Sequence, residues 1–241
     1  MINTNVKPTE ILFLDIETVR GAGKLFDMPK DSVKAWIAAM KTKKVEENLS
    51  ETSLFTRDAA LYPEFGKIVC ISLGYFEKED SFKVKAFVND DEKALLQEVS
   101  QTIPKLTSTR RNYCGHNIKG FDFPYIIRRS IVHGVHLPTN FNIYNIKPWD
   151  LNYILDTMEI WKSGAYGLGC VSLQAIASAL GVGNPKEEMS GDMVSTVYYN
   201  NSDSQRLEKI GTYCSNDTVM CAKVFLRFSK TEVNFNVSYV L

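Results

Sequence analysis

The feature that most constrains the fold is a nearly continuous apolar run close to the start of the chain, Ile11-Leu12-Phe13-Leu14-Asp15-Ile16-Glu17. A strand that is solvated on one face alternates apolar and polar side chains, whereas a strand buried on both faces reads as an unbroken apolar stretch. This run therefore predicts a strand in the interior of a layered domain. Strands interleaved with helices follow it, a pattern that is typical of a single α/β domain.

Further elements are expected along the rest of the chain. Strands are expected at 68–75, 82–88 and 111–114, and helices at 94–103, 124–133, 172–180, 190–199 and 204–228. After about residue 151 the chain is therefore expected to be mostly helical.

Residues 20–64 differ in composition from the apolar run before them, because they are rich in glycine, proline and charged side chains. We interpret this stretch as an insertion rather than a second domain. One short helix is expected within it, over residues 33–40. Trp36, Ile37 and Met40 lie near one another on that helix and are expected to form a packed apolar stripe.

Charge narrows the possible function classes. The 241 residues include 28 Lys and Arg and 28 Asp and Glu, so the formal net charge is zero. A protein that coats duplex nucleic acid without sequence preference is usually basic, because neutralising phosphates dominates its affinity. Neutrality argues against such a coat protein. It is compatible with an enzyme that grips a few nucleotides at a terminus, where bound divalent cations supply positive charge.

The cysteines and the N-terminus indicate an ordinary intracellular protein. The five cysteines contain no Cys-x-x-Cys pair, so neither a zinc ribbon nor a thioredoxin-like site is indicated. We interpret them as reduced thiols that pack as small apolar groups. The N-terminus lacks the pattern of a signal peptide, and no apolar run approaches the ~20 residues that a membrane span needs. We expect a cytoplasmic protein without membrane attachment.

Two carboxylates end the apolar run, in Asp15-Ile16-Glu17-Thr18. Side chains alternate along a strand, so Asp15 and Glu17 point to the same face. Adjacent carboxylates repel each other, and their burial without a counter-charge is costly. A divalent cation resolves both problems, since hard cations prefer oxygen ligands. The alternative is a pair of solvated acids where the strand emerges into a loop.

A second candidate segment, Gly115-His116-Asn117-Ile118-Lys119-Gly120-Phe121-Asp122, precedes the helix expected from Pro124. Asp122 lies where the N-cap of that helix would be, and capping alone would explain it. A carboxylate at a helix start can also face a metal, so the two roles are compatible. His116 is expected to be a packed or surface histidine rather than a metal ligand.

The last helix carries a carboxylate within its apolar stripe. The stripe consists of residues at three- and four-residue spacing, namely Leu207, Ile210, Cys214, Cys221, Val224 and Phe228. Rotation by about 100° per residue places Asp217 near the centre of the stripe, with Tyr213 one turn earlier. A carboxylate that faces a core needs a compensating partner, and no lysine or arginine lies beside it on this face. The alternatives to a functional role are a partner from elsewhere in the fold or a slightly rotated helix.

In this order the three segments resemble the motifs of proofreading-type exonucleases of the DEDD class, within the ribonuclease H-like superfamily. That class carries Asp-x-Glu on the first strand, Asn-x(2–4)-Phe/Tyr-Asp in the middle, and Tyr-x-x-x-Asp or His-x-x-x-x-Asp near the end. The matching segments are Asp15-Ile16-Glu17, Asn117-Ile118-Lys119-Gly120-Phe121-Asp122 and Tyr213-Cys214-Ser215-Asn216-Asp217. Thr212 stands where the histidine would be, so the chain resembles the tyrosine subclass.

The resemblance spans about residues 10–229 and is closer to stand-alone bacterial proteins related to the exonuclease domain of family B DNA polymerases. Residues 63–72 fit their second strand, and Ser172-Leu173 and Gly181 fit their helical half. The resemblance implies a ribonuclease H-like α/β fold with a central mixed sheet of about five strands, flanking helices and a helical C-terminal half. It implies one exonuclease domain over residues 1–241, with the insertion at about 20–64.

The resemblance also implies a chemistry. Two divalent cations, Mg²⁺ or Mn²⁺, would be ligated by the four carboxylates Asp15, Glu17, Asp122 and Asp217. Tyr213 would position the attacking water, since a phenol with a pKa near 10 is a poor general base at neutral pH. The implied activity is hydrolysis of phosphodiester bonds at nucleic-acid 3′ ends with release of nucleoside 5′-monophosphates.

The implied substrate is a single-stranded 3′ end, with DNA favoured over RNA. Three residues are expected to contact it: Thr18, Asn117 and Phe121. For Phe121 the expected contact is stacking on terminal bases, which is tolerant of sequence. No protein partner is indicated.

The alternatives to an exonuclease are a nucleotide-binding protein and a non-catalytic binding module. Gly21-Ala22-Gly23-Lys24 follows a strand, but Thr18 and Leu25 stand where a phosphate-binding loop needs glycine and Ser or Thr, and Phe26 breaks a dinucleotide fingerprint. A non-catalytic module that binds single-stranded nucleic acid on the same fold is the serious alternative, since folds do not dictate function. Carboxylates at all four motif positions disfavour it.

Overall fold

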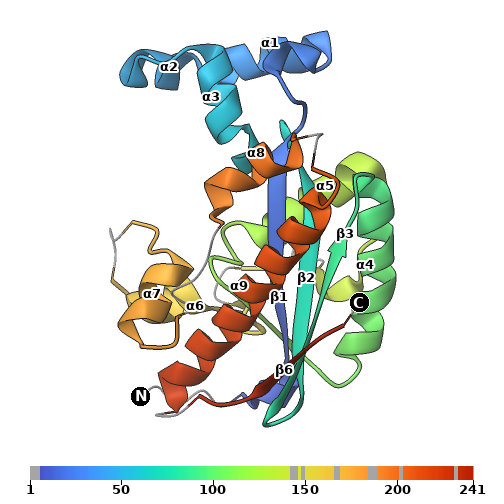
Figure 1. Cartoon of the computed structure of the whole chain (residues 1–241), viewed down its shortest axis with the longest axis vertical. Helices are drawn as coiled ribbons and strands as arrows, with labels where there is room; N and C mark the ends of the chain where they lie inside the picture. The colour runs from blue at the N-terminus through green and yellow to red at the C-terminus, as the bar shows by residue number, and fades with distance from the viewer. Residues whose placement is uncertain are drawn as a thin grey trace.

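The structure, a computed structural model, describes residues 6–141, 146–147, 150–165, 169–183, 189–200, 203–230 and 233–240. Its strands form one mixed sheet in the order β5-β4-β1-β2-β3-β6 (Figure 1). The strands are β1 (Ile11–Arg20), β2 (Gly66–Lys78), β3 (Ser81–Val88), β4 (Asn112–Gly115), β5 (Ile154–Asp156) and β6 (Asn236–Tyr239). Central β1 pairs antiparallel with β2 and parallel with β4.

Nine helices lie in the described ranges, and those after β3 pack around the sheet, whereas the first three lie beyond its end. The nine helices are α1 (Lys30–Ala39), α2 (Lys41–Glu47), α3 (Glu51–Asp58), α4 (Glu92–Thr107), α5 (Asp122–His133), α6 (Thr157–Lys162), α7 (Leu173–Ala179), α8 (Val194–Tyr198) and α9 (Arg206–Ser229). The longest, α9, crosses one face of the sheet (Figure 1). None of the helices in the described ranges is both long and apolar enough to cross a membrane. The predicted α/β class with a mixed sheet is confirmed.

β1 is the strand that organises the interior, and its alternate side chains enter two different apolar cores. Leu14 and Ile16 pack with residues of α4 and α5 on one face. Phe13 packs with residues of α9 on the other face. Because Asp15 and Glu17 alternate with Leu14 and Ile16, they share the face of Phe13. The fold therefore directs both carboxylates toward α9.

The C-terminal half is helical as expected, but it also adds two strands that the sequence did not individually predict. β5 has only three residues, too few to show a periodic pattern. β6 pairs parallel with β3 at the edge of the sheet and is largely exposed. The sheet therefore has six strands among the described residues, and both of these short strands are edge strands.

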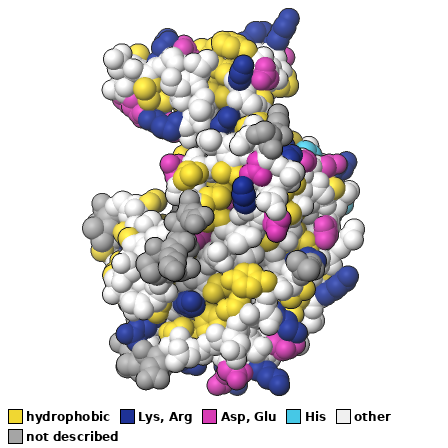
Figure 2. All heavy atoms as spheres, in the orientation of Figure 1, with side chains coloured by type: hydrophobic (Ala, Val, Ile, Leu, Met, Phe, Trp, Pro, Cys, Tyr) yellow, Lys and Arg dark blue, Asp and Glu magenta, His cyan; other side chains and the backbone are white. Residues whose placement is uncertain are grey.

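The stretch from Gly21 to Leu61 forms a helical lobe beyond the end of β1 (Figure 1). The helix expected at 33–40 is α1, and the charged segment after it also folds into helices, α2 and the start of α3. Figure 2 shows the lobe as a protrusion on which basic and acidic side chains are interspersed. That these residues are an insertion in one domain stays a prediction.

The lobe has a small core of its own around Trp36. The Trp36 ring makes edge contacts with Phe55 and Phe65, at centroid distances of 5.4 and 5.0 Å. Met40 is also buried, but Ile37 is 39% exposed. The predicted stripe is therefore wrong for Ile37, because it lies about 100° around the helix from Trp36, whereas Met40 lies one turn away on the same side.

Candidate active site

The two carboxylates of β1 lie on the sheet face that α9 covers. Glu17 is 7% exposed and Asp15 is half-buried. β1 continues three residues beyond Glu17, to Arg20, so the alternative of two solvated acids at a strand end is wrong. The Glu17 carboxylate makes no hydrogen bond and no ion pair with any residue in the described ranges. A buried charge of this kind is costly unless something else compensates it.

The helix α9 places three polar side chains opposite β1. Tyr213 and Asp217 are 7% and 8% exposed, so the helix is not rotated to direct them into solvent. The Cys214 thiol donates to Asp15 Oδ2 at 3.3 Å. Gln174 Nε2 of α7 donates to Asp217 Oδ1 at 3.4 Å, so one partner of Asp217 does come from elsewhere in the fold. This partner is a neutral amide.

Asp122 enters the site from a third element, as the first residue of α5. The N-cap is Phe121, which makes no side-chain capping bond, so Asp122 is not the N-cap that the sequence allowed. Its Oδ1 instead accepts the backbone N–H of Ile16 in β1 at 3.1 Å. The pairing of β4 with β1 ends at Phe13 and Cys114. Asp122 therefore accepts a hydrogen bond from a backbone N–H of β1 that lies beyond the residues paired with β4.

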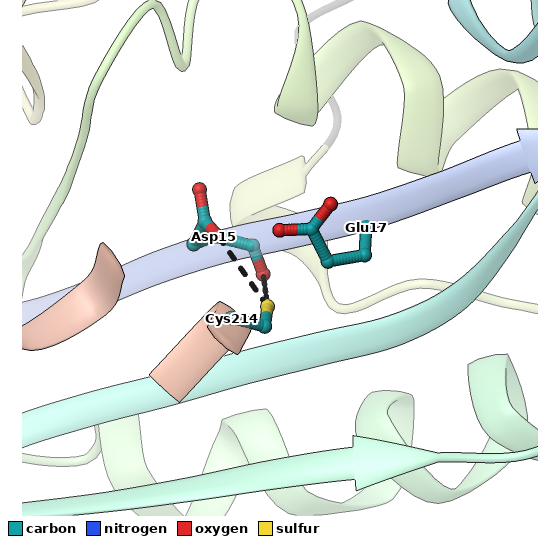
Figure 3. Close-up of side chains that lie close together, drawn as sticks. All are labelled: Asp15, Glu17 and Cys214. Carbon is teal, nitrogen blue, oxygen red and sulfur yellow. Dashed lines mark hydrogen bonds between the residues drawn. The ribbon is translucent and has the colours of Figure 1, made fainter. Parts of the chain in front are cut away.

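The tightest group in the site contains two of the predicted ligands and one residue that was not predicted. Asp15, Glu17 and Cys214 each present one ligand atom, and these three atoms lie within 4.8 Å of one another. Figure 3 shows Asp15 and Glu17 side by side on β1, with Cys214 reaching them from α9. Asp122 and Asp217 lie outside this tightest group, but their charges act on it.

Burial and mutual repulsion make the carboxylates hard to ionise. Burial is the largest cause that raises the pKa of Asp15 well above its usual value. The negative charges of Glu17, Asp122 and Asp217 raise this pKa further. The pKa of Glu17 is raised in the same direction, first by burial and then by Cys70, Asp217 and Asp122. No lysine, arginine or histidine of the described residues forms an ion pair with Asp15, Glu17 or Asp122. A bound cation is one group that could offset these charges.

The hydroxyl of Tyr213 is held in its protonated form by the same environment. Burial raises its pKa, and the charges of Asp217 and Glu17 add to the shift, as does its hydrogen bond with Asp217. A phenol whose pKa is raised further above 10 stays neutral wherever the protein is folded at ordinary pH. Tyr213 can therefore donate and accept hydrogen bonds in the site but is unsuited to remove a proton.

The loop between β4 and α5 is held by Asp156, a residue that sequence reasoning missed. Its carboxylate accepts the backbone N–H groups of Asn117 at 2.9 Å and Lys119 at 3.2 Å. It also caps α6 by accepting from Met158 N at 3.0 Å. Asn117 has a positive φ of 56°, so the loop needs such support. The available signal was an aspartate directly before a helix, which is too common to single out.

The side chains expected to contact substrate are partly engaged in the fold. The Thr18 hydroxyl is buried and donates to the carbonyl of Ala60 at 2.8 Å. The Phe121 ring is half-buried and lies 5.3 Å from the Tyr125 ring. Asn117 is half-buried in the loop that leads to Asp122. Substrate contact by Thr18, Asn117 and Phe121 stays a prediction.

His116 is a packed residue, as the sequence indicated. Its Nδ1 lies 3.0 Å from Thr157 Oγ1 and its Nε2 lies 2.7 Å from the carbonyl oxygen of Val171. Burial lowers the pKa of its imidazole. Both ring nitrogens are thus used in packing α6 and the segment before α7 against β4, and neither is free to bind a metal.

Comparisons with known proteins bear on the fold and on the family. No curated protein matches the chain. Its fold is similar to that in the structure of the family B DNA polymerase from the hyperthermophilic archaeon Pyrobaculum calidifontis, with a TM-score of 0.54 and 13% sequence identity. The likeness covers 93% of this chain but only 25% of the polymerase chain, so it shows a shared fold within a much longer protein.

The sequence itself supplies the more specific relationship. Residues 60–239 match the family described as predicted 3′-5′ exonucleases related to the exonuclease domain of PolB, and the chain belongs to this family. The matched stretch contains Asp122, Tyr213 and Asp217. It begins after β1, so the family match and the two carboxylates Asp15 and Glu17 are separate observations.

Proposed function

We propose that this protein is a metal-dependent 3′→5′ exonuclease that hydrolyses phosphodiester bonds at nucleic-acid 3′ ends and releases nucleoside 5′-monophosphates. The observation that supports this most strongly is the convergence of buried carboxylates from β1, α5 and α9 without a compensating ion pair at Asp15, Glu17 or Asp122. Such a cluster destabilises a protein unless cations bind it. Membership of the exonuclease family supports the same proposal.

The donor set fits two divalent cations. Asp15, Glu17, Asp122 and Asp217 offer carboxylate oxygens, which Mg²⁺ and Mn²⁺ prefer over nitrogen ligands. Bound together, such cations stabilise the attacking and leaving oxygens of an in-line displacement at phosphorus. The high pKa values of Asp15 and Glu17 fit this role, because ligation by cations would restore the ionised form that burial disfavours.

The remaining polar groups would orient the reactants. Tyr213, neutral and next to Asp217, would hold the attacking water by a hydrogen bond. Gln174 would fix the Asp217 carboxylate through the bond that it already makes. Asp122 would be fixed by the Ile16 N–H, so that its free oxygen keeps one direction. Each of these contacts pre-organises a group that acts in the reaction.

For the substrate we propose single-stranded 3′ ends, with DNA favoured over RNA. The fold is similar to part of a DNA polymerase, and this similarity is the support for DNA rather than RNA as the substrate. The formal net charge of zero supports a short grip at a terminus, because long phosphate tracts need a basic surface. Phe121, at the start of α5 beside Asp122, is the side chain that we propose to stack on a terminal base. The cytoplasm is the proposed compartment.

The test is a polarity assay. A single-stranded oligonucleotide labelled at its 5′ end is incubated with the protein and Mg²⁺ or Mn²⁺, with DNA and RNA in parallel. The proposal expects a ladder that shortens from the 3′ end and disappears with a chelator or with Asp217→Ala. Undegraded DNA and RNA with folded, metal-loaded protein would refute it and would favour the alternative, a catalytically inactive module that binds single-stranded nucleic acid.

A further inference from the structure

The two acids of β1 share their position with a thiol. Cys214 Sγ lies 3.3 Å from Asp15 Oδ2, and the ligand atoms of Asp15, Glu17 and Cys214 lie within 4.8 Å of one another (Figure 3). Cys214 comes from α9, so the group joins side chains that are about 200 residues apart in sequence. A set of atoms at this spacing can close around one ion with small side-chain adjustments.

Glu17 gives the second, independent observation. Its carboxylate is 93% buried, and it makes no hydrogen bond or ion pair with the described residues. In Figure 3 one of its oxygens is directed toward Asp15. Buried carboxylates normally have a hydrogen-bond partner, so an unpartnered one that faces other ligand atoms points to a cation site. Cys70 is the residue of β2 that pairs with Glu17 of β1, so it places a second sulfur next to the group.

We propose that Asp15, Glu17 and Cys214 form a thiolate-containing site for Zn²⁺, distinct in ligand chemistry from the all-oxygen Mg²⁺ pair. Thiolate sulfur is a soft ligand that Zn²⁺ and Cd²⁺ accept readily, and two carboxylates and one thiolate leave a fourth tetrahedral position open. On binding, the Cys214 S–H bond breaks, its proton passes to solvent and the sulfur lone pair forms the bond to the metal. Mg²⁺ gains nothing from the sulfur.

A functional consequence follows, and this step alone rests on the proposed exonuclease activity. Asp15 and Glu17 belong to both ligand sets, so Zn²⁺ bound through Cys214 would exclude Mg²⁺ from them. The protein would then be an exonuclease that Zn²⁺ inhibits through one cysteine. Replacement of that cysteine would relieve the inhibition without adding activity.

Direct metal binding tests the site independently of any nuclease activity. The background is Cys170→Ser, because Cys170 is the exposed cysteine among the described residues and would bind soft metals by itself. Cd²⁺ is titrated into this variant and into Cys170→Ser/Cys214→Ser, with the ultraviolet absorbance of Cd²⁺–thiolate bonds as the readout. Zn²⁺ affinity is measured by calorimetry on the same proteins, each checked for folding by circular dichroism.

The proposal expects one Cd²⁺ per chain with a thiolate band in the Cys170→Ser protein. The band should disappear in the double variant, with Zn²⁺ affinity reduced about 10- to 100-fold. Glu17→Gln in the same background should weaken Zn²⁺ binding while the thiol is intact. A band that persists without Cys214, or its absence from folded Cys170→Ser protein, would overturn the proposal. These binding results do not depend on nuclease activity, so they would stand even if the exonuclease proposal were refuted.

Discussion

The Asp122 carboxylate accepts a hydrogen bond from the backbone N–H of Ile16, at 3.1 Å and across 106 positions of sequence. Ile16 lies between Asp15 and Glu17, so this bond fixes the start of α5 directly against the two carboxylates of β1. The contact gives Asp122 two separable roles. One is the acceptor oxygen that holds the elements together, and the other is the negative charge that would bind a cation.

Substitution of Asp122 should separate these roles. Asp122→Asn keeps an oxygen that can accept from Ile16, so we expect nearly unchanged stability and an activity loss of about a hundredfold or more. Asp122→Ala leaves the buried N–H unpaired, and we expect an additional loss of about 1–3 kcal/mol in the free energy of unfolding. Urea unfolding and the oligonucleotide assay measure the two effects. Equal destabilisation by both variants would contradict the assigned hydrogen bond.

The metal-free protein should lose stability as pH rises. Burial, together with the charge of Asp156, raises the pKa of Asp122 to about 7, well above its value in an unfolded chain. The folded state therefore binds this proton more tightly than the unfolded state does, and its stabilising effect is present below about pH 4 and lost as pH rises to about 7. The slope attributable to Asp122 is at most about 1.4 kcal/mol per pH unit.

Urea unfolding in the presence of a chelator, at several pH values, checks this expectation. Asp122→Asn is the matched control, since it cannot ionise and should show a flatter profile across the same window. Saturating Mn²⁺ should restore stability most at the high-pH end, where the carboxylate is ionised and free to ligate. If the wild-type protein and Asp122→Asn had parallel profiles, Asp122 would not have a raised pKa.

Tyr213→Phe should reduce the rate of hydrolysis and leave the fold intact. The ring is buried, and phenylalanine keeps its packing, so we expect little change in stability. Loss of the hydroxyl that would hold the attacking water should lower kcat by about 10- to 100-fold with a smaller effect on KM. Because the pKa of Tyr213 is raised, the pH–rate profile of the wild-type enzyme should show no tyrosine ionisation. A high-pH limb that Tyr213→Phe removes would assign it the role of a base instead.

Asp156→Ala should destabilise the loop that leads to Asp122. It removes the acceptor for Asn117 and Lys119 as well as the cap of α6, so we expect a loss of about 2–4 kcal/mol. Asp91 caps α4 through two backbone N–H groups and supports no such loop, which makes Asp91→Ala a matched control with an expected loss of about 1 kcal/mol. Similar losses in thermal unfolding would show that Asp156 is only a helix cap.

The central strand and the carboxylate positions were predictable from sequence because each leaves a local pattern. The continuous apolar run from Ile11 predicts a strand buried on both faces, and a carboxylate within an apolar helical stripe stands out at Asp217. The ordered motifs resemble those of one family, and that resemblance predicts the fold class, which the structure and the family match confirm.

Other features depend on contacts between distant segments and leave little local trace. Cys214 fits an apolar stripe as well as any small residue, and only the fold brings it to Asp15. Asp156 is the last residue of a strand of only three residues, too short to recognise, so its support of the Asn117 loop was not foreseeable. The bond from Ile16 to Asp122 joins two elements whose relative placement no periodicity encodes.

The most direct test of the central claim measures binding and cleavage on one oligonucleotide. Glu17→Gln keeps the size of the side chain and removes its charge, so it should retain affinity for a labelled single-stranded DNA but fail to shorten it in Mn²⁺. The wild-type protein should bind the same DNA and remove nucleotides from its 3′ end. If the folded wild-type protein binds this DNA in Mn²⁺ and leaves it intact, as Glu17→Gln does, the carboxylates do not form an exonuclease site.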